Sequence, residues 1–161
     1  RLGTLNTALE YDAVAAVDLD CRALAGTEHA ADTDEARRVR SAAREQGVPV
    51  IASVHDFDAT PPVAELSELL RAAAEEGDVA KLAVTATDRG DALDLLTATH
   101  RATAAGETVA TMGMGEAGRH TRAVAPAYGS KIGYAPVDPA DATAPGQYAL
   151  ATRRRLVEGL G

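Results

Sequence analysis

Residues 48–62 read VPVIASVHDFDATPP: an apolar run, a polar loop and a pair of prolines. The run 48–54 shows no strict alternation of polar and apolar residues, which is typical of a parallel strand with both sheet faces covered. Residues 63–76 follow with the apolar spacing of a helix, and Pro62 stands at its start, where proline is tolerated. The stretch therefore predicts one strand–loop–helix unit, with His55 directly after the strand.

The pattern of a strand followed by a helix repeats over the rest of the chain. Strands are predicted at about residues 13–19, 48–54, 80–86, 108–114 and 131–136, and helices at about 31–46, 63–76, 90–104, 117–128 and 146–160. Successive strands start 23 to 35 residues apart, which suits parallel strands joined by helical crossovers. Asp32 or Thr33 is the expected N-cap of the first of these helices, and Gly47 its C-terminal cap.

Five βα units allow two α/β architectures. One is a five-stranded doubly wound domain of receiver or flavodoxin type. The other is part of a (β/α)8 barrel, which typically needs about 250 residues. In both, functional residues gather at the carboxyl ends of the strands. A chain of 161 residues suits a single domain.

Charge and composition narrow the function classes. The net charge is −8, from 16 basic and 24 acidic residues, which argues against a protein that neutralises nucleic-acid phosphates. No apolar run approaches the ~18 residues of a membrane span, and no secretory signal is visible at the start. The single Cys21 excludes an internal disulfide and a cysteine-based zinc site. We therefore expect a cytoplasmic protein that contacts neither nucleic acid nor a membrane.

Lysine is scarce. Of the 16 basic residues only Lys81 and Lys131 are lysines, and 36 residues are alanine. Such an acidic, lysine-poor composition resembles proteins of salt-loving archaea, although a high genomic GC content would produce the same bias. Lys81 lies in the apolar run 79–84, where burial favours the neutral amine, a nucleophile that forms Schiff bases with ketones. The plainer alternative is a solvated charge at a wet edge of the sheet.

His55 is the expected neighbour of Lys81, because consecutive parallel strands usually pair and both residues can then face one site. A histidine at the carboxyl end of a strand is well placed for acid–base work near neutral pH. The alternative is a loop histidine that only forms structural hydrogen bonds.

The segment MGMGEAG (112–118) contains G-x-G-x-x-G between a strand and a helix. Taken literally this is a dinucleotide fingerprint, but Asp138, the acidic residue at the right distance, lies in a loop beyond a proline. An anion site at the start of a helix fits better. Arg122 could clamp a carboxylate there, or could be an ordinary exposed helix arginine.

Other polar residues have two open interpretations. Asp18 and Asp20 end the first predicted strand and could orient a base or start a turn. Thr143 and Gln147 lie on a loop that enters the last helix and could be ligands or caps. Residues 153–155 are three arginines, expected on the solvated face of that helix, and the methionines near residue 113 are expected to serve packing.

Six segments together resemble type I 3-dehydroquinate dehydratase, the Schiff-base enzyme of the shikimate pathway. They are VDLD (17–20), IASVHDFDATP (51–61), DVAKLAVTA (78–86), TVATMGMGEAGRHTR (108–122), YGSKIGYAPV (128–137) and ATAPGQY (142–148). The second and the last are the most specific, since S-x-H-D-F-x-x-T-P and S/T-A-P-G-Q are typical of that family. The similarity is greatest to its haloarchaeal members.

The resemblance implies a role for five residues. His55 matches the catalytic histidine of the family and Lys81 its Schiff-base lysine. Arg122 matches the arginine that binds the substrate carboxylate. Thr143, a threonine where many members have serine, and Gln147 match residues that contact the substrate from a lid.

The implied reaction is that of a lyase. Lys81 forms an imine with the ring ketone of 3-dehydroquinate, and His55 takes the C2 proton and helps to expel the C1 hydroxyl as water. Hydrolysis of the imine then gives 3-dehydroshikimate. The resemblance implies no metal and no organic cofactor. Tyr134 falls where the family places an aromatic residue on the substrate ring.

The family fold is a (β/α)8 TIM barrel, and the resemblance places this chain at strands four to eight. Residues 1–161 would then be a single domain, the C-terminal part of a barrel, with about five βα units. The Glu-x-Arg segment of the family's second strand and the arginine of its third are not found here. We expect the missing edge to come from a longer protein or from another copy, as in a homodimer, because open sheet edges promote association.

Three other functions stay open at this stage. A class I aldolase or transaldolase also pairs a strand lysine with acid–base residues. A receiver-like regulatory domain would use Asp18 or Asp20 as phosphoacceptor, but its lysine belongs on the fifth strand, whereas Lys81 is on the third predicted one. A truncated, inactive α/β domain would act only by association.

Overall fold

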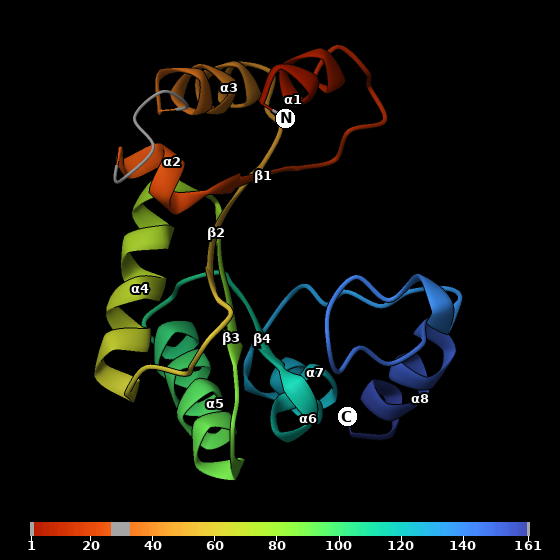
Figure 1. The fold of residues 1–161 in the computed structure, drawn as a ribbon. Coiled ribbons are helices and arrows are strands. Elements are labelled where there is room, and N and C mark those ends of the chain that lie inside the picture. The colour runs from red at the N-terminus through yellow and green to blue at the C-terminus, as the bar shows by residue number, and fades with distance from the viewer. Residues whose placement is uncertain (1, 27–32, 161) are drawn as a thin grey trace.

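The computed structural model describes residues 2–26 and 33–160. Its centre is a parallel sheet, seen almost edge-on in Figure 1, of four strands in the order β1-β2-β3-β4. The strands are β1 (Val17–Asp20), β2 (Val50–Asp56), β3 (Val79–Thr85) and β4 (Val109–Met114). Each strand pairs with the next one in the chain, and the order never reverses within the described residues. This order fits the wall of a barrel and not a doubly wound sheet, whose strand order reverses at a switch point.

The helices are α1 (Leu2–Ala8), α2 (Cys21–Ala25), α3 (Thr33–Glu45), α4 (Val63–Glu76), α5 (Arg89–Ala104), α6 (Gly115–Gly118), α7 (Thr121–Val124) and α8 (Leu150–Leu160), with the 3-10 helices η2 (Ala125–Tyr128) and η3 (Pro139–Asp141). The predicted helices at 31–46, 63–76 and 90–104 are present as α3, α4 and α5. Figure 1 shows α4 and α5 side by side along one flank of the sheet and α8 beyond the other. No helix in the described part of the chain is long and apolar enough to cross a membrane.

The two faces of the sheet have different roles. On β3, Ala80, Leu82 and Val84 belong to the main core, which also contains buried apolar residues of α4 and α5. Because side chains alternate along a strand, Lys81 and Ala83 point to the opposite face. There Ala83 packs in a small second cluster with the two methionines of β4. One face of the sheet therefore stabilises the fold, and the other is available for a site.

The predicted strand at 131–136 is not formed, so the expectation of about five βα units is not confirmed; the described residues contain four strands. The segment runs alongside β4 at its start, where Lys131 N donates to Val109 O at 2.8 Å. Gly133 and Pro136 then weaken it as a strand, since glycine has low strand propensity and proline cannot donate a ladder hydrogen bond.

Two predicted helices also differ from the structure. The expected helix 117–128 is divided into α6, α7 and η2. The last helix begins at Leu150 and not at residue 146. Gly146 itself has φ +79°, a left-handed conformation outside the helical range. Gly47 has φ +69° and confirms the predicted C-terminal cap of α3, whereas the N-cap candidate Asp32 lies outside the described residues.

The glycines of the 112–118 segment serve close packing. A Cβ on Gly118 would lie 2.8 Å from the carbonyl carbon of Gly113. Thr121 Oγ1 reinforces the contact, because it accepts a hydrogen bond from Gly113 N at 2.8 Å and donates to Gly118 O at 2.7 Å. The chain can therefore turn sharply after β4 and bring α7 back over the sheet.

Replacing Gly118 with alanine is expected to lower the free energy of unfolding by about 1–3 kcal/mol, because backbone must move to admit the methyl group. Urea titration followed by circular dichroism measures the change. Gly159→Ala is the matched control: apart from its own helix backbone and its chain neighbours, no atom lies within 4 Å of its Cβ position in α8, so stability should stay unchanged or rise slightly. Equal stability of the two variants would contradict the packing role of Gly118.

Candidate active site

The open face of the sheet carries a cavity of about 230 Å³. It is lined by His55, Phe57, Lys81, Ala83, Met112, Met114, Arg122, Tyr134, Thr143, Ala144 and Gln147. The five residues to which the family resemblance assigned a role, His55, Lys81, Arg122, Thr143 and Gln147, all line this cavity. They come from β2, β3, α7 and the loop before α8, so the fold gathers residues that are up to 92 positions apart.

Lys81 lies in the middle of β3 with only 10% of its side chain exposed. Its Nζ donates to Asp18 Oδ2 at 2.7 Å and lies 4.8 Å from the centroid of the Tyr134 ring. Asp18 comes from β1, two strands away, and its side chain crosses the same face of the sheet. The predicted apolar surroundings are therefore incomplete, because a carboxylate and an aromatic ring contact the lysine head group.

His55 faces the same cavity from β2, where it lies within the strand and not after it. In the β2–β3 register it stands opposite Ala83, two residues along from the pair of Ser53 and Lys81. The His55 ring stacks on Phe57, with centroids 5.7 Å apart and planes 6° from parallel. Both rings line the cavity, and Phe57 is 71% exposed to solvent.

Hydrogen bonds join the loop after β2 to the end of β3 and hold the backbone of Phe57. Thr60 Oγ1 donates to Thr85 O at 2.8 Å, and Thr85 Oγ1 donates to Phe57 O at 2.9 Å. Asp56 Oδ1 accepts from two following backbone N–H groups at 2.9 Å, which forms the turn itself.

Arg122 is buried in α7, with 5% of its surface exposed, so the alternative of an ordinary exposed helix arginine is wrong. Its Nη2 donates to Pro145 O at 3.3 Å, and its buried Nε has no hydrogen-bond partner within the described residues. Burial, and secondarily the charge of Arg153, lowers the pKa of the Arg122 guanidinium from its usual value. The group remains a cation at neutral pH and is suited to a carboxylate.

Thr143 and Gln147 pair with each other at the other side of the cavity. Thr143 N donates to Gln147 Oε1 at 2.9 Å, and Gln147 Nε2 donates to Thr143 Oγ1 at 3.3 Å. The loop turns at Gly146, where a Cβ would lie 2.7 Å from Gly115 O. The pair thus presents a hydroxyl and an amide from a loop that rests on α6.

Cys21 offers no competing nucleophile. It does not line the cavity, and burial, followed by the charges of Asp20 and Asp18, raises the pKa of its thiol to about 11. Since the thiolate is the reactive form, this thiol is unreactive at neutral pH.

For some residues of the site, the sequence did not predict the role that the structure gives them. Asp18 was one of two carboxylates with open interpretations, and the register of β1 on β2 places it on the face of Lys81. Met112 and Met114 serve packing as expected, but they also form a wall of the cavity. The dinucleotide interpretation of the glycine segment does not hold, because α6 is only four residues long and its glycines pack against backbone.

A family model of type I 3-dehydroquinase matches residues 1–160. Among curated proteins, the 3-dehydroquinate dehydratase of Haloarcula marismortui is 59% identical over 98% of this chain and 67% of its own length. That of Halobacterium salinarum is 51% identical over 99% of this chain and 69% of its own length. The chain thus spans about two thirds of these relatives.

The fold comparison agrees. The crystal structure of 3-dehydroquinate dehydratase from Geobacillus kaustophilus superimposes with a TM-score of 0.83 and 31% identity, over 99% of this chain and 58% of that one. A type I 3-dehydroquinate dehydratase from Clostridium difficile gives a TM-score of 0.81 and 26% identity, over 60% of its length. The family model over residues 1–160 and the identity to these relatives show that the chain belongs to the type I 3-dehydroquinase family.

Proposed function

We propose that this protein dehydrates 3-dehydroquinate to 3-dehydroshikimate through a Schiff base on Lys81. The observation that carries the proposal is a single cavity in which a buried lysine, a histidine and a buried arginine converge. Family membership supports the reaction. The relatives extend beyond the matched region, so the activity refers to the full-length protein.

The first step needs a neutral amine. Asp18, 2.7 Å from Lys81 Nζ, is placed to accept the ammonium proton. The amine then attacks the ring ketone, and loss of water forms a C=N bond between Nζ and the former carbonyl carbon. The protonated imine withdraws electrons from the adjacent carbon, which makes its C–H bond more acidic.

His55 carries the proton transfers of the second step. Its imidazole takes the C2 proton, and the electron pair moves toward the iminium nitrogen. When the pair returns, the C1–O bond breaks, and the imidazolium protonates the departing hydroxyl to give water. A second water then hydrolyses the imine, which releases 3-dehydroshikimate and restores Lys81. The imine itself serves as the electron sink, so the route uses no cofactor.

The other residues of the cavity orient the substrate. Arg122, buried and without a carboxylate partner among the described ion pairs, would bind the substrate carboxylate. Thr143 and Gln147 would exchange their mutual hydrogen bonds for bonds to substrate hydroxyls. Tyr134 covers Lys81 from one side and would pack on the ring.

Borohydride reduction tests the covalent step. Added with 3-dehydroquinate to the full-length protein, it should reduce the imine and leave one stable adduct, which peptide mass mapping locates on Lys81. Lys131, exposed and outside the cavity, is the internal control and should stay unmodified. A label on Lys131, or no label, would refute the Schiff-base assignment.

We also propose that residues 1–161 form the C-terminal part of a barrel and that the protein acts in the cytoplasm as a homodimer. The sequential order of the four strands and the unpaired outer edge of β1 in the described sheet support the barrel. Light scattering of the full-length protein tests the dimer.

A further inference from the structure

We propose that Arg153 is a positioning residue that orients Arg122 and increases the positive potential at the carboxylate-binding end of the cavity. This inference rests on the proposed function. It concerns a residue outside the substrate cavity that acts through Arg122.

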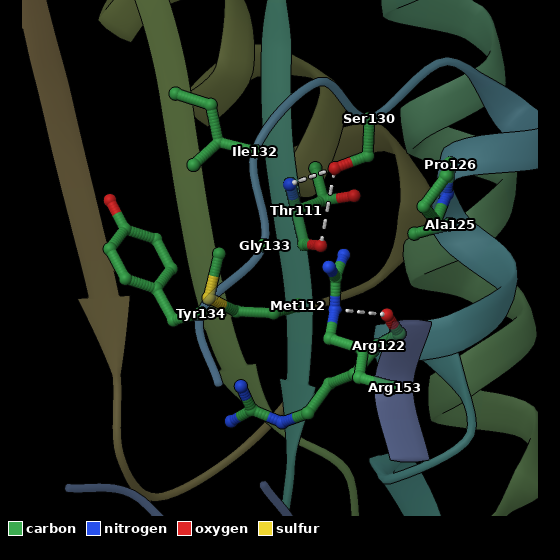
Figure 2. A pocket seen from close by; sticks show the side chains of 10 residues that line it. All are labelled: Thr111, Met112, Arg122, Ala125, Pro126, Ser130, Ile132, Gly133, Tyr134 and Arg153. Atoms are coloured by element: carbon green, nitrogen blue, oxygen red, sulfur yellow. Dashed lines mark hydrogen bonds between the residues drawn. The ribbon is translucent and has the colours of Figure 1, made fainter. Parts of the chain in front are cut away.

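The first observation is a direct contact between α8 and α7. Arg153 Nε donates to the backbone oxygen of Arg122 at 3.1 Å, the dashed line beside α8 in Figure 2. The Arg122 side chain in turn donates to Pro145 O, in the loop that precedes α8. Arg122 is therefore held at its backbone by the helix and at its side chain by the loop of the same segment.

The second observation is that Arg153 is half-buried, which corrects the expectation of three solvated arginines. Arg154 and Arg155 on the same helix are exposed, and Arg154 pairs with Glu158. Arg153 instead lines a small cavity of about 10 Å³ beside Arg122, together with Thr111, Ser130 and Gly133 (Figure 2).

Gly133 makes this position possible. A Cβ at Gly133 would overlap the Arg153 guanidinium, and the glycine has no left-handed φ that would require it for another reason. The guanidinium of Arg153 therefore occupies the space that a side chain at residue 133 would fill. This also gives a reason for the glycine that interrupts the predicted strand.

The third observation is a charge imbalance. Burial first, and then the nearby charge of Arg153, lowers the pKa of Arg122, and neither arginine forms an ion pair within the described residues. Two like charges repel, and an anion bound at either one relieves the repulsion. Arg122 faces the substrate cavity, so the substrate carboxylate is the anion that gains from both charges.

Steady-state kinetics of the full-length protein test the inference. Arg153→Ala should raise KM for 3-dehydroquinate by about tenfold and change kcat less than about twofold, because it weakens binding of substrate and transition state alike. Arg153→Gln, which has no charge, should behave like the alanine variant, and Arg153→Lys should recover most of the affinity. Arg155→Ala removes the same charge from an exposed position of the same helix and should leave KM unchanged.

Gly133→Ala provides a second route to the same result. Its methyl group should displace the Arg153 guanidinium and so raise KM, although residue 153 is still arginine. Since both substitutions remove the same interaction of Arg153 with Arg122, the double variant Gly133→Ala/Arg153→Ala should raise KM no further than either substitution alone. Thermal unfolding of each variant confirms that it is folded.

The outcomes separate this inference from the proposed function. If wild-type protein shows neither turnover nor a borohydride adduct, the proposed function fails and this inference with it. If wild-type protein turns over and Arg153→Ala has the KM of Arg155→Ala, only the role of Arg153 is overturned. A fall in kcat that Arg153→Lys does not restore would also overturn it, since that pattern indicates a structural role.

Discussion

Lys81→Arg is expected to abolish turnover, with a loss of at least about 10⁴-fold, because a guanidinium stays charged and cannot form the imine. The substitution is a stringent test, since arginine keeps the positive charge that Asp18 binds at 2.7 Å in the wild-type protein. The fold should therefore survive while the covalent route is closed. The absorbance of the conjugated enone product measures the rate.

Lys131→Arg is the matched control. It makes the same chemical change at the second lysine of the chain, which is exposed and contacts β4 through its backbone nitrogen. This variant should retain full activity and its borohydride adduct. Measurable turnover by a folded Lys81→Arg protein would show that the reaction does not need a Schiff base at this lysine.

His55→Ala is expected to slow kcat by about 10²–10⁴-fold, because proton transfer at C2 and at the leaving hydroxyl loses its catalyst. Imine formation depends on Lys81, so borohydride should still trap the adduct. The combination of trapping without turnover distinguishes this variant from Lys81→Arg, which should show neither.

His100→Ala controls for the loss of an imidazole elsewhere. His100 is exposed on α5, where its ring meets Tyr128 edge-on, and it does not line the cavity. Its replacement should leave kcat unchanged. If His55→Ala were as active as this control, His55 would have no part in the mechanism.

The strands and long helices were predictable where the apolar pattern was strong. The helix at 63–76 agrees with α4 at both ends, and the strands around Ser53 and Lys81 are displaced by at most two residues. The segment 131–136 was not predictable in the same way. It has the composition of a strand, but whether Gly133 and its neighbours form a ladder depends on a partner strand and on Arg153, which packs against it from α8.

The members of the site were predictable from the motifs, and their mutual contacts were not. His55 and Lys81 follow from adjacent strands, but the ion pair of Lys81 depends on the alignment of β1 with β2 and β3. The burial of Arg122 and Arg153 depends on how α7 and α8 pack, which has no local signature in the sequence. From helical spacing alone, both arginines could be placed on an exposed helix face.

The sequential order of the sheet has a consequence for how the protein folds during synthesis. Each strand pairs with the strand made just before it, and about 30 residues separate the paired positions, so every loop that must close is short. Synthesis runs from the N-terminus, so all four described strands have been made once Met114 is reached, before the residues that follow it. The cavity is completed last, because Arg122, Thr143 and Gln147 all belong to that final segment.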